Sequence, residues 1–101
     1  MDKELLELAA KAAGITLGEY WTPYLGSHHD HFWNPLTDDG DALRLAVLLR
    51  IEVEPWIHGN SEFARAAVCE VLVDEPHGDD PLAATRRVIV RAAAEIGRSM
   101  K

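Results

Sequence analysis

The C-terminal stretch constrains the fold most, because its apolar and basic residues separate onto two sides of a helix. Pro81 follows two aspartates, and a proline at the first helical position behind an aspartate cap is a strong helix start. Residues 81–99 are therefore predicted to form a helix that buries one side. The apolar side holds Leu82, Ile89, Ala92, Ala93, Ile96 and Met100, and the opposite side holds Arg86, Arg87, Arg91, Arg98 and Lys101.

Two more helices are predicted upstream. Residues 2–13 carry apolar side chains at three- and four-residue spacing, with Asp2 as a start cap and Gly14 as the left-handed residue that ends the helix. A second helix is predicted to start at Thr37 or Asp38 and to end near Leu49. Apolar residues cover most of its circumference, so we expect it to be more deeply buried than the other two.

The segments between the helices favour strands. A short edge strand is predicted over residues 20–25, because Pro23 cannot donate a ladder hydrogen bond. Residues 51–56 alternate apolar and acidic side chains, and residues 67–73 are rich in valine. Turn residues at 58–61 predict that these two segments form a hairpin. The whole chain, residues 1–101, is thus predicted to be one α+β domain with the order α-β-α-β-β-α and a small antiparallel sheet.

Composition narrows the class of protein. Seventeen acidic residues against ten basic ones give a formal net charge of −7, which argues against general binding to nucleic acid or anionic lipid. A single cysteine excludes an internal disulfide and a cysteine-rich zinc site. The sequence shows neither a signal peptide nor a run of transmembrane length. These features predict a soluble protein of a reducing cytoplasm.

The charge is distributed unevenly along the chain. From Pro81 onward there are five basic residues and one acidic residue, whereas the preceding eighty residues hold five basic and sixteen acidic ones. The arginine side of the last helix is therefore a candidate docking surface for an acidic partner, through Arg86, Arg87, Arg91 and Arg98. The alternative is a solvated face, or one partly neutralised by the acidic body of the same chain or by a second copy.

The stretch Asp38-Asp39-Gly40-Asp41 could be a ligand site or a helix start. A calcium loop counted from Asn34 would need a glycine where Asp39 stands and a glutamate where Leu45 stands. A phosphate-binding loop needs several glycines and avoids carboxylates. Aspartates do satisfy free N–H groups at a helix N-terminus, so we interpret the stretch as a helix start.

A histidine-rich run offers the one candidate metal site. Imidazole and carboxylate ligands could come from His28, His29, Asp30 and His31. Asp38 or Asp39 could fold near them. Zinc sites need three or four converging ligands, and no second ligand motif is present, so an exposed loop that carries histidines is the alternative.

The sequence gives no support for catalysis. His58 and His77 are interpreted as solvated turn residues, and Cys69 as a small buried side chain. The serines lack a nucleophile motif, and the paired aspartates are adjacent, which points them about 100° apart on a helix. We therefore assign no catalytic residue and no cofactor. Of the tryptophans we expect most to anchor the core, and any that is exposed to mark an interface.

Three blocks of the chain resemble one known family. ELLELAAKAAGI, WNPLTDDGDALRLAV and DDPLAATRRVIVRAAAEIGRSM are similar to small phage and prophage proteins of the phage ABA sandwich domain family. The resemblance implies a compact α/β sandwich in which helices flank a small antiparallel sheet. The family carries no established activity, so the resemblance supplies no functional residues.

Two functions are consistent with these observations. The first is a non-enzymatic accessory protein of a phage or prophage that works in the cytoplasm of the bacterial host. It would bind a host protein, a phage protein or a second copy of itself, without membrane contact and without nucleic acid. The alternative is a small-ligand or metal-binding protein that uses His28–His31 together with Asp38 and Asp39.

Overall fold

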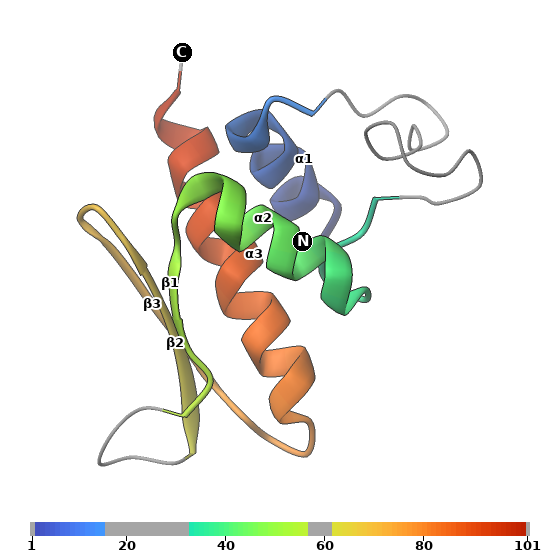
Figure 1. Ribbon diagram of the computed structural model, residues 1–101, viewed down its shortest axis with the longest axis vertical. Coiled ribbons are helices and arrows are strands. Elements are labelled where there is room, and N and C mark those ends of the chain that lie inside the picture. The colour runs from blue at the N-terminus through green and yellow to red at the C-terminus, as the bar shows by residue number, and fades with distance from the viewer. Residues whose placement is uncertain (1, 16–32, 57–61, 101) are drawn as a thin grey trace.

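The computed structural model describes residues 2–15, 33–56 and 62–100 (Figure 1). In this part of the chain it shows a compact α+β domain with a small antiparallel sheet, which confirms the predicted fold class. The elements are α1 (Asp2–Ala13), α2 (Asp39–Leu49), β1 (Glu52–Glu54), β2 (Phe63–Val68), β3 (Val71–Pro76) and α3 (Pro81–Ser99). The strand predicted at 20–25 and the turn at 58–61 lie outside the described residues.

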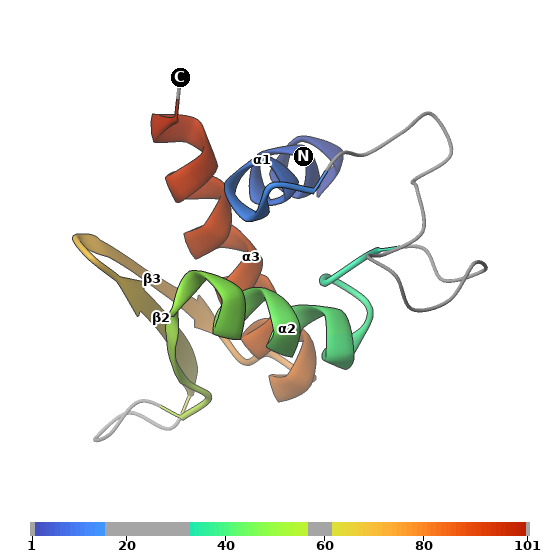
Figure 2. The same ribbon diagram turned by 45° about the horizontal axis from the view of Figure 1, so that its top comes forward.

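Helix α3 is the central element of the domain. It packs against one face of the sheet, and α2 and α1 pack against other sides of it (Figures 1 and 2). Because α3 has neighbours on several sides, its buried residues surround much of the helix and include Val88, Val90 and Ala94. The prediction that one apolar side of α3 is buried along its whole length is therefore wrong, because Leu82 and Met100, at the two ends of that side, are exposed.

Helices α1 and α3 approach each other closely through small side chains. Ala9 and Ala10 of α1 and Ala93 of α3 are buried. A Cβ atom built on Gly97 would lie 2.0 Å from the backbone oxygen of Leu8. Glycine at position 97 is thus required for the observed distance between the two helices.

The sheet has the strand order β1-β2-β3, and both pairings are antiparallel. The predicted pairing of the first hairpin is confirmed in the register Glu52↔Ala67. The single strand predicted over 67–73 is wrong, because the chain reverses between Val68 and Val71. Cys69 begins this two-residue turn with a φ of 54° and is exposed, not buried. A two-residue hairpin turn requires a positive φ, and glycine or asparagine usually occupies such a position. Because cysteine stands at position 69, the sequence gives no sign of this turn.

Helix α2 differs most from the prediction. Its buried side consists of Asp41, Ala42, Leu45 and Ala46, and the helix is not the most deeply buried of the three. The reason is that α2 packs mainly on α3, so that only one of its two apolar sides is covered. The other side remains at the surface.

Candidate functional site

The aspartate-rich stretch before α2 is a helix start, as predicted. A side-chain oxygen of Asp38 accepts a hydrogen bond from the Asp41 N–H at 2.8 Å, which caps the helix. Asp41 is fully buried and accepts from the Asn34 N–H and from Arg44, each at 2.9 Å. Asp39 forms an ion pair of 2.6 Å with Arg86. All three carboxylates therefore have partners within the protein.

The same contacts hold α2 firmly on α3. Nε of Arg86 donates to the Leu36 carbonyl oxygen at 2.8 Å, while Nη1 of the same guanidinium binds Asp39. The Arg86 side chain is only 17% exposed. One arginine thus links the turn before α2, the first residue of α2 and the central helix.

The outward side of α2 presents three large apolar side chains to solvent. The exposed fractions are 64% for Leu43, 70% for Val47 and 53% for Leu48. In Figure 1, α2 lies on the viewer's side of α3, and no described element covers it. We call these three residues, with the flanking Arg44 and Arg50, the α2 outward surface.

This surface differs from scattered exposed apolar residues, which are normal in soluble proteins. Leu43 and Val47 are one helical turn apart on the same face, whereas Leu48 points about 100° away from Val47. The exposed pair of Leu43 and Val47, with Leu48 exposed at its side, lies on a firmly anchored helix, and such apolar surface is typical of a protein contact. The prediction that the whole helix is deeply buried did not single these residues out, because periodicity alone does not tell which apolar side of a helix faces inward.

The four arginines predicted as a docking surface form ion pairs within the chain. Besides Arg86 with Asp39, Arg87 lies 3.4 Å from Asp2, and Arg91 contacts Glu75. Arg98 and Glu95, on the same helix, are 3.7 Å apart. Arg86, Arg87 and Arg91 thus connect α3 to α2, α1 and β3 respectively. The geometry matches the alternative of neutralisation by the acidic body, and docking through these arginines stays a prediction.

One exposed ion pair on the sheet shifts the ionisation of both partners. Nε of Arg65 lies 2.7 Å from Asp74 Oδ1, and Nη2 lies 3.1 Å from Oδ2. These hydrogen bonds and the positive charge of Arg65 lower the pKa of the Asp74 carboxyl, and the Asp74 carboxylate raises the pKa of Arg65. The pair joins β2 to β3 in register and has a structural role.

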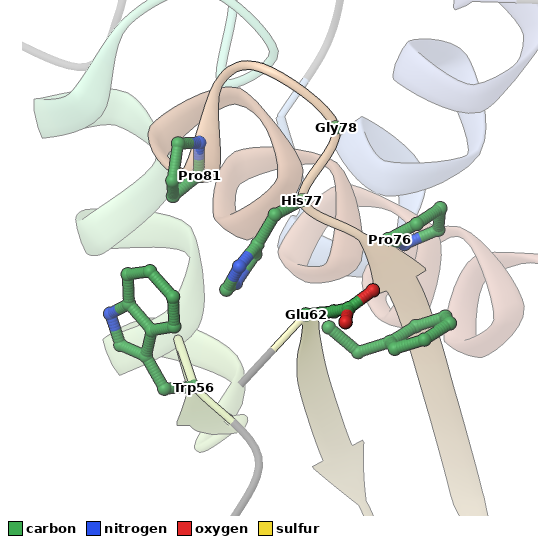
Figure 3. A pocket seen from close by; sticks show the side chains of 7 residues that line it. Trp56, Glu62, Pro76, His77, Gly78 and Pro81 are labelled. Carbon is green, nitrogen blue, oxygen red and sulfur yellow. The ribbon is translucent and has the colours of Figure 1, made fainter. Parts of the chain in front are cut away.

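A pocket of about 590 Å³ opens at the end of the sheet where β3 leads into α3 (Figure 3). His77 Nε2 lies 2.6 Å from the Pro55 carbonyl oxygen, and the His77 and Trp56 rings form an edge-to-face pair with centroids 4.2 Å apart. His77 is buried, so the prediction of a solvated turn residue is wrong. The reason is tertiary: the β3–α3 connection brings it against Pro55. The lining residues are Trp56, Glu62, Phe63, Pro76, His77, Gly78 and Pro81.

The predicted metal ligands at 28–31 lie outside the described residues, so this site stays a prediction. Within 2–15, 33–56 and 62–100, no group of three or more His, Cys, Asp or Glu side chains is arranged to hold a metal ion. Asp38 and Asp39, the other members of the predicted site, serve the cap and the ion pair described above.

No known protein family, curated protein or solved structure matches this chain. The resemblance to the phage ABA sandwich domain family therefore stays a prediction. In the described part of the chain, no helix is both long enough and apolar enough to cross a membrane.

Proposed function

We propose that this protein is a non-enzymatic protein-binding module and that the α2 outward surface is its binding site. The observation that supports the proposal is the exposure of Leu43, Val47 and Leu48 on a helix that is capped, ion-paired and packed on the central helix. Burying the exposed parts of these side chains against a partner would contribute roughly 1–2 kcal/mol each. A rigid apolar helix face loses little conformational entropy on binding.

The α2 outward surface is favoured over the arginine side of α3. Arg86, Arg87 and Arg91 already hold the fold together, so a partner would have to compete with their intramolecular carboxylates. Reversing these charges would also loosen the contacts of α3 with α1, α2 and β3. Such variants therefore report on stability as much as on binding.

An accessory role for a phage or prophage in the bacterial cytoplasm belongs to the same proposal. It rests on the resemblance predicted from the three sequence blocks, together with the acidic composition. A host protein, a phage protein or a second copy of the chain would be the partner.

Affinity capture from bacterial lysate tests the proposal with two matched variants. Val47→Lys places a charge in the centre of the α2 outward surface, where the side chain is 70% exposed. Leu72→Lys places a charge on a leucine of the sheet that is 60% exposed. We expect Val47→Lys to lose captured protein and Leu72→Lys to retain it, with unchanged circular dichroism in both. Equal capture by the two variants would show that α2 is not the binding site.

A further inference from the structure

The pocket at the end of the sheet presents a fixed aromatic ring to solvent. Its volume of about 590 Å³ and its largely aromatic and apolar lining are typical of small-ligand sites. Trp56, which follows β1, is 56% exposed, whereas Trp33 is buried in the core. The buried His77 ring points toward Trp56 (Figure 3), and the edge-to-face contact between the two rings fixes the orientation of the indole. A bound ligand therefore meets a preformed aromatic surface.

The lining of this pocket is poor in hydrogen-bond donors. Pro76 and Pro81 have no N–H group. The backbone N–H of His77 donates to the Glu62 carbonyl oxygen at 2.8 Å. Nε2 of His77 lies 2.6 Å from the Pro55 carbonyl oxygen, which can only accept, so the proton on Nε2 is also used within the protein. An anion in this pocket would find few donors to replace its water.

The formal charge around the pocket is negative. Glu62 lines it and is exposed, and none of the other lining residues is an acid, a lysine or an arginine. Two more carboxylates, those of Asp79 and Asp80, follow the lining residue Gly78 directly along the chain. The face of an aromatic ring is itself the negative part of its quadrupole. Trp56 and Glu62 thus both favour a positively charged ligand.

We propose that this pocket binds an organic cation, whose alkylammonium or guanidinium group lies against the Trp56 ring and pairs with the Glu62 carboxylate. Two sources offer this chemistry: a small quaternary ammonium compound, and the side chain of a lysine or arginine in a peptide. A neutral ligand of the same shape would gain the contact with the ring but not the attraction of the charges. The pocket shares no residue with the α2 outward surface, so this site goes beyond the proposed function.

Titration with choline chloride, followed by NMR at constant ionic strength, is the first test. The matched probe is the neutral alcohol in which a carbon atom replaces the choline nitrogen, because it has the same shape and no charge. One ring and one carboxylate in an open pocket predict a dissociation constant on the order of millimolar. We expect choline to shift the amide resonances of His77 and Gly78, and the neutral alcohol to bind at least about fivefold more weakly.

Three tripeptides with blocked ends distinguish the two sources of the cation. Each has glycine on both sides of a central lysine, arginine or glutamine. Tighter binding of a cationic tripeptide than of choline assigns the site to a peptide side chain, and tighter binding of choline assigns it to a small quaternary ammonium compound. The glutamine tripeptide should bind at least about fivefold more weakly than the lysine and arginine tripeptides.

Substitutions test the two groups that the proposal assigns. Glu62→Gln removes the charge of the lining carboxylate, and Asp79→Asn removes one exposed charge nearby but outside the lining. We expect Glu62→Gln to weaken choline binding at least about threefold and Asp79→Asn to change it little, because Coulomb attraction in water falls quickly with distance. Trp56→Leu should weaken it at least about fivefold, and Trp56→Phe should weaken it less because a ring remains. Circular dichroism melts show whether each variant is folded, and the comparison of Glu62→Gln with Asp79→Asn decides if Trp56→Leu is not.

Three results would overturn the cation site. The first is equal binding of choline and the neutral alcohol, which would assign the pocket to apolar ligands. The second is an equal loss in Glu62→Gln and Asp79→Asn, which would mean general attraction to an acidic protein. The third is the absence of shifts at His77 and Gly78 with every cation up to about 100 mM, far above a millimolar dissociation constant. None of these results changes what Val47→Lys does to capture from lysate, so the two proposals fail separately.

Discussion

The substitution Gly97→Ala tests the packing of α1 on α3. The new Cβ would lie 2.0 Å from the Leu8 backbone oxygen and 2.8 Å from its carbonyl carbon. Real Cβ atoms essentially never approach closer than 3.0 Å, so the two helices must separate by about 1 Å. Overpacking a core costs about 1–3 kcal/mol, and the upper end applies because the clash is with backbone. Alanine regains at most about 1 kcal/mol of helix propensity.

The net expectation is a loss of about 2 kcal/mol in the free energy of unfolding, which corresponds to a fall of about 8–16 °C in the melting temperature. Thermal unfolding followed by circular dichroism measures it. Gly40→Ala is the matched control, because the three atoms nearest to its Cβ belong to side chains, with the Arg44 guanidinium at 3.1 Å and the Asp38 carboxylate at 3.3 Å, and none belongs to the backbone. We expect that control to melt close to the wild type. A Gly97→Ala protein that melts at or above the wild-type temperature would refute the close packing of α1 on α3.

Three further predictions concern the turn, the start of α2 and the sheet. Cys69→Gly should raise the free energy of unfolding by about 1 kcal/mol, whereas Cys69→Ala should not, because only glycine adopts a φ of 54° without strain. If the turn were unstrained, urea denaturation would show no difference between Cys69→Gly and the wild type. Asp41→Ala should lower the free energy of unfolding by about 1–3 kcal/mol, and by more than Asp38→Ala does. The reason is that it removes the buried carboxylate that accepts hydrogen bonds from the Asn34 N–H and from Arg44. The opposite ranking of the two variants in urea denaturation would contradict this assignment. Arg65 lowers the pKa of Asp74 on folding, so this pair stabilises the protein above the pKa of the unfolded carboxyl, near 4, and the benefit disappears as the pH falls through the lower folded pKa. The stability difference between wild type and Asp74→Asn should therefore be small and constant above about pH 5 and shrink below about pH 4, and a difference that grows on acidification would be evidence against the pair.

The sequence identified those features whose causes are local. The start of α3 behind Asp80, the cap of α2 at Asp38 and the end of α1 at Gly14 each depend on neighbouring backbone groups, and all three are confirmed. One alternative for the excess of basic residues in α3 was neutralisation by the acidic body of the same chain. The structure agrees with that alternative, since Arg86 and Arg91 pair with carboxylates on other elements.

The features that the sequence did not reveal depend on tertiary contacts. Two apolar sides of α2 are nearly equivalent in periodicity, and only the position of α3 decides that Leu45 is buried and Val47 is exposed. His77 lies in turn-like sequence but packs against Trp56, which is distant along the chain. The turn at Cys69 lacks the glycine that usually indicates a hairpin. The candidate site was missed for the first of these reasons.

The central claim is that the α2 outward surface binds a protein partner. Amide chemical shifts measured by NMR while a protein captured from bacterial lysate is added test this claim residue by residue. We expect shifts that grow with the added partner at Leu43, Val47 and Leu48, and none in the Val47→Lys variant. Shifts confined to the arginines of α3 or to the Trp56–His77 pocket would contradict the account.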